Sequence, residues 1–198
     1  MTRNRLIIFV KNPIEGEVKT RLASSLGDEK ALDVYQKLLK ITARETANVN
    51  AEKLVSYSKF VEERDNFDKN IFEKSVQRKG DLGEKMKHAF RYGFDDGFNR
   101  IVLIGSDCPE ISQSLIDKAF KELSEADSVI GPSDDGGYYL IGLSRFIPQI
   151  FDDVEWSTSS VFSSTITALE DIGATYHILK KLNDIDTESD LNASNLLI

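Results

Sequence analysis

The sequence of 198 residues predicts a single α/β domain, a doubly wound fold with a mixed, mainly parallel sheet flanked by helices. Two observations support this prediction. Short apolar runs alternate with longer amphipathic stretches along the whole chain. The runs at 6–10 and 101–105 are apolar throughout, as expected of strands buried on both faces of a parallel sheet. Because no repeat or linker interrupts the alternation, we expect one domain over residues 1–198.

The individual elements follow in order from the local periodicity. Strands are expected at residues 6–10, 53–57, 101–105, 128–131, 138–143 and 176–179. Helices are expected at residues 28–49, 82–98, 112–123 and 159–171. Thr187 and Asp190 have the spacing of a capping box, which predicts the start of a last short helix. Ligands of open α/β sheets bind at the carboxyl ends of the strands, so the segments that follow the strands are the candidate sites.

Composition excludes several classes of function. The net charge of -8 disfavours nucleic-acid binding, which depends on surplus Lys and Arg. No apolar run approaches the roughly 20 residues of a membrane span, and no signal peptide is recognised. We therefore expect a cytoplasmic protein. The single cysteine, Cys108, leaves no partner for an intrachain disulfide and no Cys-based zinc site, and we expect it to be a packing residue.

The segment after the first strand combines cations with a glycine and a hydroxyl. It contains Lys11, Gly16, Lys19, Thr20 and Arg21 before the next predicted helix. Backbone N–H groups, a lysine point charge and the planar arginine fork are the groups that bind a polyphosphate. The Gly-Lys-Ser/Thr core of a P-loop is absent. The alternative is a solvated surface loop.

Asp107 follows the third apolar run, directly after Gly105 and Ser106. A carboxylate at the end of a central strand is a natural ligand for Mg²⁺, which takes one or two carboxylates together with substrate phosphates and water. The alternative, that Asp107 caps the following helix, is less favoured because Ser112 lies nearer that helix.

A second acidic segment, near the C-terminus, contains Asp184 and Asp186. The two alternate, so in an extended chain their side chains point the same way. Asp186 is a candidate to complete a metal site with Asp107, and Asp135 is the other candidate for the second ligand. The alternative for this segment is a solvated acidic start of the last helix.

Three weaker segments each have two interpretations. Asp135, Gly136 and Gly137 form either a tight turn alone or a turn that also lines an acceptor pocket. The segment 77–85, with Gln77 and Gly83, either contacts a base, ribose or phosphate or is only a strand-to-helix turn. The segment 156–159 either places a ring or hydroxyl near an acceptor, with Trp156 as the candidate residue, or caps a helix.

Taken together, these segments resemble a bacterial family of glycosyltransferases or nucleotide-diphospho-sugar transferases with a GT-A-type fold. The matching stretches are residues 11–26, 77–86, 105–109, 132–143, 156–161 and 184–191. The fold also looks like that of molybdopterin-cofactor and phospholactate nucleotidyltransferases. This resemblance implies that Gly16, Lys19, Thr20 and Arg21 hold the donor phosphates, and that Asp107 and Asp186 hold the metal. The glycine-rich LxxGxGxR-like loop of nucleotidyltransferases is replaced here by KNPIEGEVKTRL, so the donor stays open.

We therefore expect a Mg²⁺- or Mn²⁺-dependent transferase that uses a nucleoside triphosphate or an NDP-sugar and an unknown small-molecule acceptor. Lys19, Arg21 and Asp107 are its expected catalytic residues, because phosphoryl chemistry depends on positioning and electrostatics. Lys11, Gln77 and the neighbouring loop residues are the expected nucleotide contacts. The alternative from another class is a non-catalytic nucleotide-binding or regulatory protein on the same fold. A phosphohydrolase is disfavoured because Lys11, not an aspartyl nucleophile, follows the first strand.

Overall fold

A computed structural model describes residues 2–196 and confirms the α/β architecture. Seven strands form one mixed sheet in the order β3-β2-β1-β4-β6-β5-β7. The strands are β1 (Asn4–Val10), β2 (Glu52–Tyr57), β3 (Phe72–Val76), β4 (Arg100–Ile104), β5 (Ser128–Pro132), β6 (Tyr138–Leu143) and β7 (Tyr176–Ile178). Only β6 runs antiparallel to its neighbours β4 and β5 among the described pairs. All six predicted strands are present to within two residues at each end.

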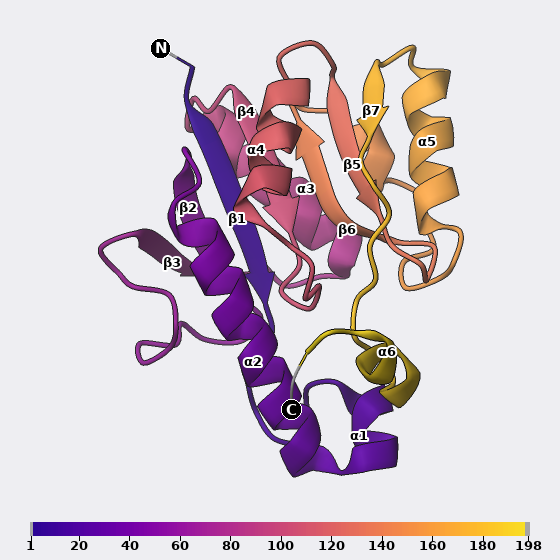
Figure 1. The fold of residues 1–198 in the computed structure, drawn as a ribbon. Helices are drawn as coiled ribbons and strands as arrows, with labels where there is room; N and C mark the ends of the chain where they lie inside the picture. Colours follow the sequence, from indigo (N-terminus) through magenta and orange to yellow (C-terminus); the bar gives the residue numbers. More distant parts are fainter. Residues whose placement is uncertain (1, 197–198) are drawn as a thin grey trace.

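Helices cover both faces of the sheet (Figure 1). They are α1 (Thr20–Leu26), α2 (Asp28–Ala47), α3 (Leu82–Asp95), α4 (Gln113–Glu122), α5 (Val161–Asp171) and α6 (Glu188–Ala193), with a 3₁₀ turn, η1 (Pro148–Phe151). Buried apolar residues of α2 and α4 pack on one face of the sheet, and those of α3, η1 and α5 pack on the other. A third, smaller cluster joins α1, α2 and α6 beyond the carboxyl ends of the central strands.

The 3₁₀ turn η1 was not predicted, and α3 ends at Asp95 where residue 98 was expected. Two further elements, β3 and α1, also differ from the sequence-based expectation. β3 was not predicted because it is an edge strand that reads FEKSV, with only Phe72 buried, so it lacks an apolar run. The segment of Lys19 and Arg21 was expected to be a loop before the helix predicted at 28–49, but a seven-residue helix, α1, begins at Thr20. This helix is too short to show a helical period, and Leu22 is its only residue that is buried in the described structure.

Parallel pairing of β1 with β4 sets the position of the candidate loops. Their register aligns Ile8 with Ile104, so both strands end at the same edge of the sheet. The loop after β1 and the loop that contains Asp107 therefore meet at this edge. No helix among residues 2–196 is long and apolar enough to cross a membrane.

Candidate functional site

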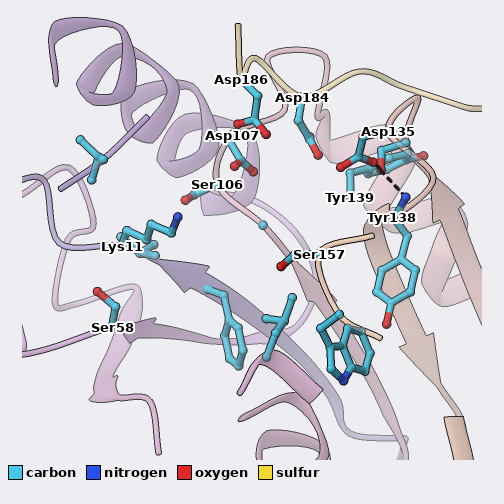
Figure 2. A pocket seen from close by; sticks show the side chains of 18 of the residues that line it. Lys11, Ser58, Ser106, Asp107, Asp135, Tyr138, Tyr139, Ser157, Asp184 and Asp186 are labelled. Atoms are coloured by element: carbon cyan, nitrogen blue, oxygen red, sulfur yellow. Dashed lines mark hydrogen bonds between the residues drawn. The ribbon is translucent and has the colours of Figure 1, made fainter. Parts of the chain in front are cut away.

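A pocket of about 570 Å³ opens at this edge of the sheet. Its volume lies within the range of about 300–1,000 Å³ that is typical of small-molecule sites. The pocket is lined by segments far apart in sequence, namely the β1–α1 loop, the end of β2, the start of α3, the loop after β4, the β5–β6 turn, the segment before α5 and the segment before α6. Figure 2 shows side chains from these segments converging on one space.

The loop after β1 is held by two residues that the sequence analysis did not single out. Buried Asn12 donates from its backbone N–H to Ser58 and from its side-chain amide to the Phe60 carbonyl, and its Oδ1 accepts from the Lys59 N–H. The Tyr35 hydroxyl accepts from the Lys11 N–H at 2.9 Å. These bonds fix the start of the loop against α2 and the segment after β2. The backbone of Lys11, which lines the pocket, is therefore held in place.

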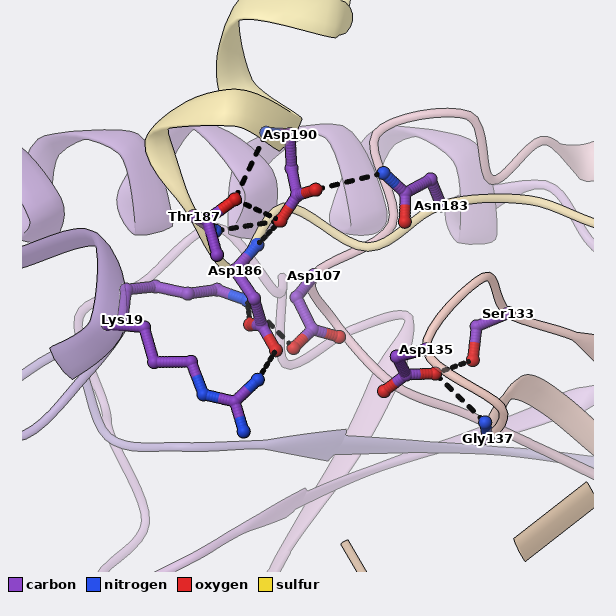
Figure 3. Close-up of polar contacts among 10 residues, drawn as sticks. Lys19, Asp107, Ser133, Asp135, Gly137, Asn183, Asp186, Thr187 and Asp190 are labelled. Carbon is purple, nitrogen blue, oxygen red and sulfur yellow. Dashed lines mark hydrogen bonds and ion pairs between the residues drawn. The ribbon is translucent and has the colours of Figure 1, made fainter. Parts of the chain in front are cut away.

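Lys19 lies at the centre of the charged cluster. Its ammonium Nζ donates to Asp107 Oδ2 at 2.9 Å and to Asp186 Oδ1 at 2.8 Å (Figure 3). The Lys19 side chain is only 5% exposed, whereas the two acidic side chains are 39% and 40% exposed. Burial alone would lower the pKa of Lys19, but the charges of Asp107 and Asp186 outweigh it and raise this pKa. The site therefore holds a permanently charged ammonium between two carboxylates.

The backbone of Lys19 is in the left-handed region, with φ 48° and ψ 45°, at the N-cap of α1. This conformation costs a non-glycine residue about 1–2 kcal/mol, and such strain is concentrated at functional sites. Arg21 follows on α1, is largely exposed, and places a guanidinium nitrogen 4.0 Å from Asp186 Oδ2. Lys19 and Arg21 therefore approach the acidic groups from the same side of the pocket.

A C-terminal segment carries Asp186 across the carboxyl end of the sheet. The Ile185 N–H donates to the Asp107 carbonyl at 3.1 Å, which joins this segment to the loop after β4. The predicted capping box is present, with the Thr187 hydroxyl accepting from the Asp190 N–H at 3.2 Å and Asp190 accepting from the Thr187 N–H at 2.8 Å. The Asp186 N–H also donates to Asp190, at 3.1 Å. The start of α6 therefore fixes the position of the Asp186 backbone.

Asp184 lines the same pocket and was left without a role by the sequence analysis. Its Oδ1 is buried and has no hydrogen-bond partner within the described part of the chain. Burial, reinforced by the nearby charge of Asp107, raises the pKa of Asp184 well above its ordinary value, although Lys19 opposes the shift. The i, i+2 alternation with Asp186 was its only signal in the sequence.

The β5–β6 turn forms the pocket wall opposite Lys11 (Figure 2). Asp135 Oδ1 accepts from the Ser133 hydroxyl at 2.5 Å and from the Gly137 N–H at 2.9 Å. Gly136 has φ 87°, and its carbonyl accepts from the Phe162 N–H at the start of α5. The turn is thus a tight turn, as predicted, and it also lines the pocket through Ser133, Asp135 and Gly137.

Trp156, the only tryptophan of the chain, lines the pocket and packs against Gly83 in the first turn of α3. A Cβ placed on Gly83 would lie 2.2 Å from the indole Nε1. Ser157 follows in the left-handed region, with φ 65°, and its side chain faces the pocket in Figure 2. The segment before α5 is therefore positioned by contact with α3.

This contact predicts that Gly83→Ala is destabilising by about 1–3 kcal/mol, because the added methyl group overpacks against the indole. Chemical denaturation measures the change. In a Trp156→Ala background the same substitution should be neutral or stabilising, since alanine favours a helix over glycine by up to about 1 kcal/mol. An equal loss of stability in both backgrounds would contradict the proposed contact.

The structure brings most of the predicted site residues into one pocket. Those that line it are Lys11, Lys19, Thr20, Arg21, Gln77, Asp107, Asp135, Gly137, Trp156 and Asp186. Gly16, Gly83 and Gly136 are not among the lining residues. Tyr35, Ser58, Ser106 and Ser133 line the pocket without having been predicted, because isolated hydroxyl residues carry no motif. Burial raises the pKa of Cys108 to about 12, so its thiol is neutral and packs in the core.

The pair of carboxylates from Asp107 and Asp186 fits a divalent cation that takes its other ligands from substrate phosphates and water. Both acids already share one positive group, the Lys19 ammonium. No group of three or more His, Cys, Asp or Glu side chains is arranged as a metal site in residues 2–196. The two carboxylates would therefore supply only part of the coordination of a cation, and phosphate oxygens of a bound donor and water would have to supply the other ligands. Asp135, the other candidate second ligand, lies on the β5–β6 turn, where it accepts from Ser133 and Gly137. The ion pairs of Lys19 among the described residues are with Asp107 and Asp186.

Comparisons with known proteins agree with this architecture. The model of a family described as "Uncharacterized protein conserved in bacteria (DUF2064)" matches residues 42–158, more than half of the chain. A crystal structure of a candidate nucleotide-diphospho-sugar transferase from Desulfovibrio desulfuricans G20 is 34% identical and superposes with a TM-score of 0.91, over 98% of this chain and 86% of that one. The search of curated proteins gave no match.

Two more distant structures share the fold. CMP:2-keto-3-deoxy-manno-octonic acid synthetase complexed with CTP superposes with a TM-score of 0.57 at 9% identity, over 97% of this chain and 96% of that one. Rv0371c from Mycobacterium tuberculosis H37Rv, in complex with manganese, superposes with a TM-score of 0.58 at 11% identity, over 97% of both chains. At these identities the similarity extends to the fold alone.

Proposed function

The chain belongs to the bacterial DUF2064 family, and from this premise we propose that it is a metal-dependent transferase that takes its transferred group from a nucleotide donor. The fold it shares with a candidate nucleotide-diphospho-sugar transferase and with a CTP-bound synthetase supports the class. The observation that carries the proposal is the contact of Lys19 with both Asp107 and Asp186 inside one pocket. This arrangement places groups that bind phosphate beside groups that bind a cation.

In this proposal, Asp107 and Asp186 hold Mg²⁺ or Mn²⁺ together with the donor phosphates. The bound ion would supply charge neutralisation on the phosphate oxygens. Lys19 and Arg21 donate hydrogen bonds to the same phosphates and stabilise the charge that develops on the leaving group. A manganese complex among the proteins of this fold supports the presence of a cation.

The donor is either a nucleoside triphosphate or an NDP-sugar. The cations Lys11, Lys19 and Arg21 that line the pocket favour a triphosphate, whereas the relative that is 34% identical favours an NDP-sugar. The reaction products distinguish the two. Nucleotidyl transfer releases pyrophosphate, and glycosyl transfer from an NDP-sugar releases a nucleoside diphosphate.

A thermal-shift panel tests the proposal directly. Nucleoside triphosphates, NDP-sugars and nucleoside diphosphates are each added with Mn²⁺ and, separately, with EDTA. A donor present at about 100 times its Kd adds roughly 2.7 kcal/mol of stability and should raise the Tm of a domain of this size by about 5–10 °C. The shift should disappear in EDTA. If no nucleotide raises the Tm in the presence of Mn²⁺, the proposed function is wrong.

A further inference from the structure

The pocket carries more acidic groups than a metal and its donor would use. Asp107, Asp135, Asp184 and Asp186 all line it. Asp107 and Asp186 contact Lys19, but neither Asp135 nor Asp184 has a Lys or Arg nitrogen within 4.0 Å in the described residues. We call Asp135 and Asp184 the acidic pair.

The two members of the acidic pair differ in their surroundings, because Asp135 is exposed at the mouth of the pocket whereas one oxygen of Asp184 is buried without a partner in the described residues. Asp135 Oδ1 is held by Ser133 and Gly137, which fixes the carboxylate and leaves no bond to Oδ2 within the described chain. Asp184 Oδ1 is buried and accepts no hydrogen bond there. An oxygen buried in this way requires a donor, because an unmade hydrogen bond is unfavourable. In Figure 2, Asp184 lies between Asp186 and Asp135, and Asp135 lies on the side of the pocket away from Lys11. The charges of both Asp107 and Asp135 act on Asp184.

The surroundings of the acidic pair limit what can supply those donors. Trp156 lines the same pocket with its ring, and Ser157 and Thr158 add hydroxyl groups. Lys181, in the segment after β7, is already paired with Asp134 of the turn at 2.8 Å and does not line the pocket. Lys85 lines the pocket from α3, but it does not pair with either acid. A phosphate or carboxylate on the ligand would therefore meet repulsion from the Asp135 carboxylate and would supply no hydrogen-bond donor to the buried oxygen of Asp184.

We propose that the acceptor of the transferase binds by presenting hydroxyl or ammonium groups to Asp135 and Asp184, and that it is a hydroxyl-rich or amino-bearing compound without a negative group at this end. This inference rests on the proposed function. The fixed carboxylate, the unpartnered buried oxygen and the aromatic side chain together form a site for hydrogen-bond donors on a ring or chain.

The fluorescence of Trp156 can report binding, since Trp156 is the only tryptophan of the chain and lines the pocket. Glucose, glucosamine and glucose 6-phosphate are titrated against the full chain with Mg²⁺ and the nucleotide that gives the largest thermal shift. Fluorescence gives the Kd of each. We expect glucose or glucosamine to bind at least about tenfold more tightly than glucose 6-phosphate, a difference of about 1.4 kcal/mol. Preference for glucose identifies hydroxyl groups as the donors, and preference for glucosamine identifies an ammonium group.

Asp135→Asn and Asp184→Asn should each weaken the preferred probe about tenfold, while Asp134→Asn, next to the pair and outside the pocket, should leave it unchanged. Because two variants are measured, the test can still be read if one of them fails to fold. Tighter or equal binding of glucose 6-phosphate, unchanged binding in both variants, or no binding of any probe would overturn the inference. Nucleotide binding is measured in the same samples, so loss of the proposed function would appear separately as loss of the thermal shift.

Discussion

Asp107→Asn should abolish metal-dependent donor binding while the fold stays intact. The substitution removes one of the two carboxylates that contact Lys19 but retains the shape of the side chain. Loss of a residue that only orients a ligand typically lowers metal affinity by about 10–100-fold, so loss of a direct ligand should lower it by at least about 100-fold. The Tm shift by the donor with Mn²⁺ should therefore disappear, and product formation should fall with it.

The fold should survive because Asp107 is 39% exposed and Asp186 remains to pair with Lys19. Complete removal of a partner from a buried charge costs about 3–5 kcal/mol, and the cost here should be smaller since one carboxylate is left. Asp134→Asn makes the same change of charge outside the pocket and is the matched control. Donor binding by Asp107→Asn that equals the wild type, or that persists in EDTA, would refute the metal-site proposal.

The sequence predicted the sheet and the main helices because their buried faces impose periodic patterns. Residues 6–10 and 101–105 were recognisable as central strands since both faces of each are covered. β3 escaped because an edge strand buries little and its sequence is mostly polar. α1 escaped because a short helix is stabilised by tertiary packing, here in the cluster with α2 and α6, and not by its own period.

For the candidate site, the sequence predicted which strands are followed by candidate site residues, but it did not predict which loops contact one another. Asp107 and Asp186 were proposed together, and their shared contact with Lys19 is a tertiary feature that no spacing reveals. For the same reason Asn12 was overlooked and Asp184 was left without a role. Asn12 acts through bonds to the loop after β2, and Asp184 is distinguished only by its burial and its unpartnered oxygen. Pairings between distant segments depend on the fold, so they became visible only in three dimensions.

Lys19→Met should change metal affinity and donor affinity in opposite directions. The ammonium and a divalent cation would compete for the same two carboxylates, Asp107 and Asp186. Two unit charges about 4 Å apart interact by about 4 kcal/mol at an effective dielectric constant of 20, and hydration and salt reduce this near half-exposed acids. We therefore expect Mn²⁺ to bind the nucleotide-free variant at least about tenfold more tightly than the wild type, which is about 1.4 kcal/mol.

The donor should bind more weakly to the same variant, by about 1.5–3 kcal/mol, because a charge-assisted hydrogen bond to phosphate is lost. Methionine retains most of the apolar stem that is buried at this position, where the side chain is 5% exposed. Titration of Mn²⁺ by electron paramagnetic resonance and of the donor by calorimetry measures the two affinities. Lys181→Met, which removes an exposed lysine outside the pocket, is the control and should change neither. If Lys19 had only a structural role, its loss would lower the affinity for Mn²⁺ and the affinity for the donor together. Tighter Mn²⁺ binding combined with weaker donor binding would instead identify Lys19 as a residue that lies between the two metal ligands and contacts the donor phosphates.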